Sequence, residues 1–262
     1  MEKWNEVPAG VINAATQRIW VALGDQAGKI STRINTDPRF VDSIARFMIH
    51  GENEPYTSQE FARLIMDNNF FGVEEAMRYF GINPTSKQIA DLTEVPFNIR
   101  TLLSCRNTHN LVAVFPLSIL NILSIATKRN LPLFKGQDKA WFKKELFATE
   151  KGEMRWLLVR RTSVPKSEHK TWEQAWCHIG ENEEIPTARI VVYTAIGHFL
   201  ASGERLFGKI ELRCLEHCAV TGGRIYVGVF DELGLDIDSV SDGESDDSLG
   251  LAGCQEAKPT DL

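Results

Sequence analysis

The feature that most limits the possible folds is a change of sequence pattern near residue 105. Before this point, apolar side chains recur three and four positions apart in short segments that Gly and Pro separate, which is typical of helices. After it, short apolar runs alternate with turn residues, which is typical of strands. The pattern therefore predicts an α+β protein: a small helical module over residues 1–105, followed by an α+β domain with a mostly antiparallel sheet over residues 106–262.

The expected module opens with a helical pattern over residues 8–50 and continues with three shorter helices. Thr57 or Ser58 can cap the first of these, because a side-chain oxygen at that position accepts a hydrogen bond from the first helical turn. Gly81 is placed to end the second, and the third restarts just after Pro84.

The second half combines strands with one apolar helix. The helix is expected to have Pro186 in its first turn and to stop at Gly203. Gly222-Gly223 indicates a hairpin turn, and Pro116 should close the first strand. We expect strands over residues 109–120, 156–161, 209–214, 224–230 and 234–240.

Charge and hydropathy exclude several classes of function. The net charge is −6, yet residues 231–250 contain eight Asp or Glu and no Lys or Arg, so the rest of the chain carries a net +2. Without a basic stripe we expect no nucleic-acid binding, since phosphate contacts need Lys and Arg. No apolar run is long enough for a membrane span, and the first residues lack the profile of a signal peptide. We therefore expect a cytoplasmic protein, or one displayed by a route that uses no signal peptide.

Catalytic and metal motifs are weak. No zinc-protease, nucleophile-elbow or dinucleotide-binding pattern occurs, and the phosphate-loop likeness at residues 24–31 has the wrong spacing. Five cysteines, an odd number, argue against a disulfide framework. A zinc site with Cys254 as fourth ligand is disfavoured because a second tight ligand cluster is missing. The three other ligands of that site would be Cys214, His217 and Cys218. We expect no cofactor, and we expect Cys214 to face the core from a strand.

Several segments together resemble a family of uncharacterised proteins of candidate-phylum bacteria. They are NFFGVEEA at 69–76, LVAVFPLSI at 111–119, PTA at 186–188, HFLASGERLF at 198–207 and GL at 250–251. The C-terminal pattern of that family is similar to the variable proteins of diversity-generating retroelements. In those proteins, mutagenic reverse transcription of adenines diversifies the exposed face of a C-type-lectin-like domain. The resemblance therefore implies a C-type-lectin-like fold for the second domain.

The resemblance also divides the C-terminal segment into framework and variable positions. The implied framework is Arg224, Ile225, Val227, Phe230, Gly234, Leu235, Ile237, Asp242, Leu249, Gly250 and Leu251. The implied variable, ligand-binding positions are Tyr226, Gly228, Val229, Asp231, Asp236, Asp238, Ser239, Ser241, Ser245 and Asp246. The chain departs from the family where Ser241 replaces a Trp and where AGCQE follows Leu251 in place of Ala-Arg-Lys.

The leading hypothesis is a non-enzymatic recognition protein. Tyr226 would be its rigid aromatic anchor, and the eight carboxylates favour a protein ligand of basic character.

Three alternatives remain open. The first interprets the acidic segment as a partly disordered tail. An enzyme would use His198 with Glu204 or Cys214. A calcium-dependent lectin-like binder would use Asp236, Asp238 and Asp242.

Overall fold

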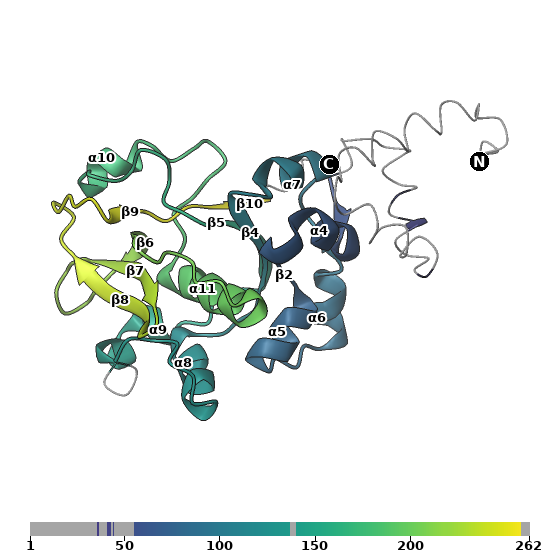
Figure 1. Cartoon of the computed structure of the whole chain (residues 1–262), viewed down its shortest axis with the longest axis horizontal. Coiled ribbons are helices and arrows are strands. Elements are labelled where there is room, and N and C mark those ends of the chain that lie inside the picture. The colour runs from purple at the N-terminus through teal and green to yellow at the C-terminus, as the bar shows by residue number, and fades with distance from the viewer. Residues whose placement is uncertain (1–35, 37–40, 43, 45–54, 137–139, 258–262) are drawn as a thin grey trace.

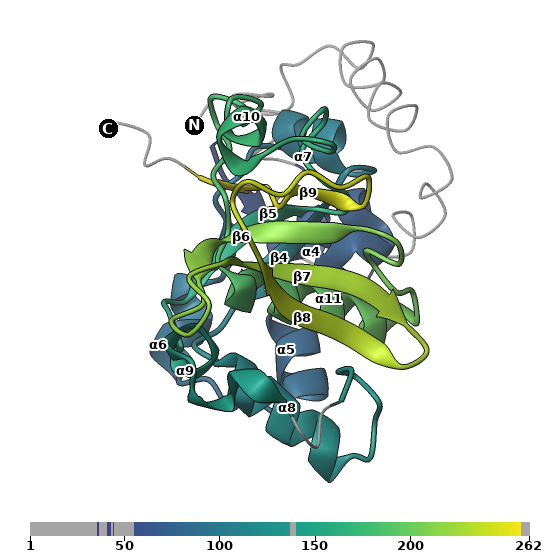
Figure 2. The ribbon, with the colours of Figure 1, turned by 90° about the vertical axis from the view of Figure 1, so that its left-hand side faces the viewer.

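The computed structural model describes residues 36, 41–42, 44, 55–136 and 140–257. The helical pattern predicted over residues 8–50 and the loop at residues 24–31 lie almost entirely outside the described residues. Within them, the chain is a mixed α+β structure with two four-stranded sheets, and one long helix lies between the sheets (Figures 1 and 2). Most strand pairs in these sheets are antiparallel, which confirms the predicted fold class at this level.

The central helix is α11, Ala188–Ser202. It contacts β4 of one sheet and β6 and β7 of the other, and every residue from Ala188 to His198 is buried. A helix covered on opposite sides needs no polar stripe, which explains why its sequence is apolar nearly all round. It ends at Gly203 as predicted, where φ is 79° and a side chain would be strained. Pro186 precedes the N-cap Thr187 and so lies just outside the first turn, which corrects its predicted position.

One sheet, the β4 sheet, has the strand order β10-β5-β4-β2. β4 pairs antiparallel with β5 and parallel with β2, and β5 pairs antiparallel with β10. Its strands are β2 (Phe70–Phe71), β4 (His109–Val114), β5 (Arg155–Arg160) and β10 (Cys254–Glu256). The strand predicted over 109–120 therefore ends before Pro116, and the strand predicted over 156–161 is confirmed. The AGCQE departure lies in ordered structure, because it supplies β10.

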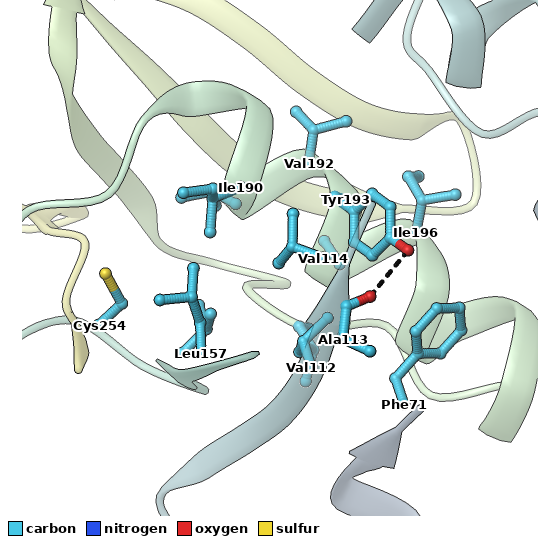
Figure 3. Packing of buried hydrophobic residues seen from close by; sticks show 14 of the residues in the cluster. Phe71, Val112, Ala113, Val114, Leu157, Ile190, Val192, Tyr193, Ile196 and Cys254 are labelled. Atoms are coloured by element: carbon cyan, nitrogen blue, oxygen red, sulfur yellow. Dashed lines mark hydrogen bonds between the residues drawn. The ribbon is translucent and has the colours of Figure 1, made fainter. Parts of the chain in front are cut away.

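The core joins the β4 sheet to α11. The hydroxyl of Tyr193 donates a hydrogen bond to the carbonyl of Ala113 at 3.0 Å, and the Phe71 ring meets the Tyr193 ring edge-on (Figure 3). The opposite side of the same sheet is also covered, since Trp156 lies against Phe70 and donates from Nε1 to the carbonyl of Leu92. Burial on both sides explains why all six residues of β4 are buried.

The other sheet, the β7 sheet, has the order β8-β7-β6-β9. β6 and β7 form the predicted hairpin, and Gly222 in its turn has φ of 69°. β9 pairs parallel with β6. The strands are β6 (Glu211–His217), β7 (Arg224–Asp231), β8 (Gly234–Val240) and β9 (Leu249–Leu251). Three of these confirm predicted strands. They place half of residues 231–250 in strands, which contradicts the interpretation of this segment as a disordered tail.

The described part of the predicted helical module contains short strands as well as helices. Ser58 caps the first helix and Gly81 ends the second, as predicted. The elements are β1 (Thr57–Ser58), α4 (Gln59–Met66), η4 (Asp67–Asn69), α5 (Val73–Phe80), α6 (Ser86–Asp91), β3 (Glu94–Val95) and α7 (Ile99–Cys105). The purely helical character is therefore corrected: β1 pairs with β3, and β2 adds to the β4 sheet.

Four further short elements complete the described structure. They are α8 (Ile119–Lys128), η6 (Trp141–Lys144), α9 (Leu146–Thr149) and α10 (Trp172–Trp176). Among the described residues, no helix has both the length and the apolar character needed to cross a membrane.

Candidate ligand-binding face

The β7 sheet has one face toward α11 and one face away from it. On the inner face, Leu212, Val227 and Ile237 are buried. The strand register pairs Tyr226 with Asp238 on one side and with Arg213 on the other. Because side chains alternate along a strand, these residues share the outer face.

The next row of the outer face is formed by Gly228, which pairs with Asp236 and with Glu211. Part of the outer face is covered by residues 163–172: Arg213, fully buried, donates to the carbonyl of Lys170 at 2.9 Å. The uncovered part, with Glu211, Tyr226, Asp236 and Asp238, is here called the Tyr226 face.

Negative charge is crowded on the Tyr226 face. Burial raises the pKa of Glu211, and the carboxylates of Asp246, Asp236 and Asp238 raise it further. Burial also raises the pKa of the Tyr226 hydroxyl, with added effects from Glu211 and the two aspartates. Repulsion of this kind is relieved when a cation approaches, so the face is suited to a positively charged group.

One lysine already neutralises part of this charge. Lys135 Nζ lies 3.3 Å from a carboxylate oxygen of Asp231 and 3.7 Å from one of Asp236. Because Lys135 contacts both aspartates, Asp231, one of the predicted site residues, lies at the margin of the Tyr226 face. Despite this lysine, the carboxylates of Asp236, Asp238 and Asp246 raise the pKa of Glu211.

Burial separates the two sets of positions that the family resemblance implies. Ten of the eleven framework residues are buried, and Asp242 is intermediate. Nine of the ten predicted ligand-binding residues are intermediate or exposed, and Gly228 is the exception. A Cβ placed on Gly228 would lie 2.0 Å from the carbonyl oxygen of Ile210, so no side chain fits there. Gly228 therefore belongs with the framework rather than with the binding residues.

The other predicted residues are spread around the Tyr226 face. Val229 occupies a bulge in β7, with φ of 44°, and its amide donates to the carbonyl of Ile210. Ser239 pairs with Ile225 and so alternates to the side opposite Asp238, where its hydroxyl meets that of Thr221 at 2.9 Å. Three residues, Ser241, Ser245 and Asp246, lie exposed between β8 and β9.

Asp242, which the family resemblance places in the framework, has a structural role whose partners only the structure shows. Its carboxylate accepts two hydrogen bonds from the Arg224 guanidinium, at 2.9 and 3.1 Å. The guanidinium stacks 3.4 Å from the ring centre of Trp172, whose amide donates to the Asp242 carbonyl. The hydrogen bonds from Arg224 lower the pKa of Asp242 more than burial raises it, and His217 adds to the lowering. The loop after β8 is thus anchored to the sheet.

The calcium alternative gains no support from this geometry. Asp242 is engaged by Arg224, whereas Asp236 and Asp238 lie on the Tyr226 face. Among the described residues, no group of three or more His, Cys, Asp or Glu side chains is arranged to hold a metal ion. The zinc set is also divided: Cys214 is fully buried in the core, as predicted, and His217 turns to Asp242.

The residues of the enzyme alternative are only partly brought together. His198 Nε2 lies 3.0 Å from Glu204 Oε2, and Arg161 donates to the other oxygen of Glu204 at 2.6 Å. Burial lowers the pKa of His198 more than Glu204 raises it, which favours the neutral imidazole. The Cys214 thiol is fully buried, donates to the carbonyl of Leu212, and has a pKa raised by burial, so it is no nucleophile.

Glu211 is the residue of the Tyr226 face that sequence reasoning missed. The sequence placed Glu211 in a predicted strand, on the same face as Arg213 two residues later. Only the strand register shows that Gly228 pairs with both Glu211 and Asp236, so that these two carboxylates lie in one row of the outer face. Comparison of the chain with protein-family models, with curated proteins and with solved structures found no match.

Proposed function

We propose that this chain is a non-enzymatic recognition protein with a C-type-lectin-like second domain. Its Tyr226 face binds the basic side chains of a protein ligand. The observation that carries the proposal is the separation of the buried framework from the interspersed positions, which apart from Gly228 are partly or fully exposed. This is how a recognition surface is built on a rigid scaffold, because the interspersed side chains can change without disturbing the core.

The chemistry of the Tyr226 face supports a basic partner. Tyr226 is half-buried and flanked by Asp238 and Glu211, so an arginine side chain could stack on the phenol ring and pair with a carboxylate. Further arginines would relieve the mutual repulsion of the remaining carboxylates.

A binding experiment with a defined probe tests the ligand class. The probe is an acetylated hexa-arginine amide, titrated calorimetrically into the full chain at low ionic strength. Tyr226→Ala should weaken binding roughly tenfold, since aromatic anchors dominate such interfaces. Asp236→Asn with Asp238→Asn should weaken it roughly threefold to tenfold, because each exposed ion pair contributes up to about 1 kcal/mol.

The control pair is Asp91→Asn with Glu181→Gln, which changes the net charge equally at two exposed positions outside the Tyr226 face. Circular dichroism verifies that each variant is folded. Equal weakening by the control pair would mean that the peptide responds only to net charge, and the assignment to the Tyr226 face would be lost.

Diversification by a retroelement is a separate part of the proposal, and it is tested on DNA. The locus of the gene should contain a near-copy of the 3′ coding segment that differs mainly at adenines, with a reverse-transcriptase gene nearby. A locus with neither element would contradict the proposal that a retroelement diversifies this gene. The binding proposal would then still depend on the calorimetric test alone.

A further inference from the structure

Four ionisable residues meet on the β4 sheet, away from the Tyr226 face: Cys105, His109, Arg160 and Glu183, here called the Cys105 cluster. A tight turn connects the end of α7 to the start of β4, where the Thr108 amide donates to the Cys105 carbonyl at 2.9 Å. His109 and Arg160 are direct partners in the register of β4 and β5. Three separate parts of the sequence therefore contribute to the cluster.

Glu183 holds the imidazole and the guanidinium together. Its Oε1 lies 2.7 Å from Arg160 Nε and 3.5 Å from His109 Nε2. The Thr108 hydroxyl lies 2.8 Å from His109 Nδ1, so both ring nitrogens have a polar neighbour. This arrangement orients the imidazole, and the buried carboxylate favours its protonated form.

The Cys105 thiol lies beside this imidazole. Burial raises the pKa of Cys105, but His109, Ser104 and Arg160 together outweigh it, so that the pKa falls below that of an ordinary thiol. Burial lowers the pKa of His109, but Cys105 and Glu183 raise it overall. The same contacts with His109 and Arg160 hold the pKa of Glu183 at about 2 against the opposing effect of burial. The cluster therefore favours a thiolate paired with an imidazolium.

Access to the sulfur is narrow. Cys105 is 6% exposed and His109 3% exposed, although the neighbouring Ser104 and Arg106 are exposed. The Ser104 hydroxyl lies 3.8 Å from Cys105 Sγ, which places a polar group at the approach to the sulfur. So small an exposed area excludes a polymer or a bulky substrate, so a reactant at this sulfur must be a molecule of a few atoms.

We propose that Cys105 is a site of oxidation by small hydroperoxides, with His109 as the proton donor and Glu183 as the residue that positions the imidazole. The thiolate attacks one peroxide oxygen: an S–O bond forms, the O–O bond breaks, and the sulfur is oxidised by two electrons to a sulfenic acid. The departing oxygen takes the proton of the imidazolium and leaves as water or alcohol. The peroxide is reduced, and His109 becomes neutral.

The test uses the full chain and compares two cysteines in one sample. Hydrogen peroxide is added at pH 6.5 with dimedone to trap sulfenic acid, and mass spectrometry measures the labelling of each cysteine. Iodoacetamide rates are measured from pH 5 to 9. The internal control is Cys177, an exposed thiol that donates to the carbonyl of Glu173. An ordinary thiol is only about 1% thiolate at pH 6.5, so we expect Cys105 to react roughly tenfold faster than Cys177.

Variants separate thiolate activation from mere accessibility. His109→Gln should slow dimedone labelling of Cys105 roughly tenfold and move the alkylation profile to higher pH, and Glu183→Gln should move it in the same direction by less. If His109→Gln fails to fold, the proposal is still tested by the pH profile of Cys105 alkylation in the wild-type chain and in Glu183→Gln. The proposal is overturned if Cys105 reacts no faster than Cys177 at pH 6.5, or if the folded variants leave the profile of Cys105 unchanged. Neither result bears on the Tyr226 face.

Discussion

Two residues of β7 that lie two positions apart on one face have opposite roles. Tyr226 presents a half-buried ring among carboxylates, while Gly228 lets the backbone of Ile210 approach its own backbone closely. The residue type at Gly228 is therefore determined by the space available, whereas the position of Tyr226 has room for a large side chain. On the proposed binding face, a position can contribute a contact only where a side chain has room.

Adding a single methyl group tests this distinction at the residue scale. Gly228→Ala should lower the free energy of unfolding by about 1–3 kcal/mol, because the Cβ must displace backbone atoms of Ile210 and Glu211. The matched control is Gly208→Ala, where the nearest atom to a Cβ is the Phe230 carbonyl oxygen at 3.9 Å. Urea denaturation measures both. Equal effects of the two substitutions would show that the close approach at Gly228 carries no cost.

At the scale of elements, α11 connects the two sheets. Arg189 donates from Nη1 to the carbonyl of Phe115, and Tyr193 donates to that of Ala113, so successive turns of the helix follow β4. The side chains of Val192 and Ile196 are completely buried with them (Figure 3). The sheet that carries the Tyr226 face is supported on its inner side by this helix.

Shortening one side chain of α11 should therefore weaken the whole fold. Ile196→Ala should lower the free energy of unfolding by about 2–5 kcal/mol, since it deletes fully buried methyl and methylene groups and leaves a cavity. The same substitution at Ile89 in α6, which is 42% exposed, should cost less than about 1 kcal/mol. Chemical denaturation compares the two, and similar losses would contradict the central position of α11.

At the scale of the whole molecule, one core extends across the boundary predicted at residue 105. Phe71 and Phe80 from the first part contact Tyr193 of α11. The Cys105 cluster also joins both parts, because Cys105 ends the first part and interacts with His109 of the second. Within the second part, Glu183 forms ion pairs with His109 and Arg160. Ion pairs of this kind make the stability of the folded chain depend on pH.

The folded-state pKa of Glu183 is about 2, below the value of about 4.3 for a glutamate in an unfolded chain. The unfolded state therefore takes up the proton first, and the stability that Glu183 contributes is complete above about pH 4.5 and lost as the pH falls from about 4 to 2. The difference in free energy of unfolding between wild type and Glu183→Gln should be larger at pH 6 than at pH 3. Glu181→Gln, at an exposed neighbouring position, is the control. A difference that stays constant with pH would contradict the assignment.

Local patterns in the sequence predicted the longest helix and the five longest strands of the described structure. Ser58 caps a helix and Gly203 ends one because capping depends only on the nearest turn of backbone. The hairpin at Gly222 and the bounds of β8 were predicted for the same reason, since turn preference and alternation act within a few residues. The two-residue strands β1, β2 and β3 were missed, because segments so short carry no periodicity.

The sequence by itself determined the α+β class, the positions of the five longest strands and the location of the acidic residues, because these depend on side chains close together along the chain. Only the tertiary structure decided which of those residues share a surface. Strand register brings Glu211 to Asp236 across β7, and sheet pairing brings His109 to Arg160 and Glu183. Contacts between distant segments leave no periodic signal in a single sequence, so the Cys105 cluster became visible only when the strands were paired.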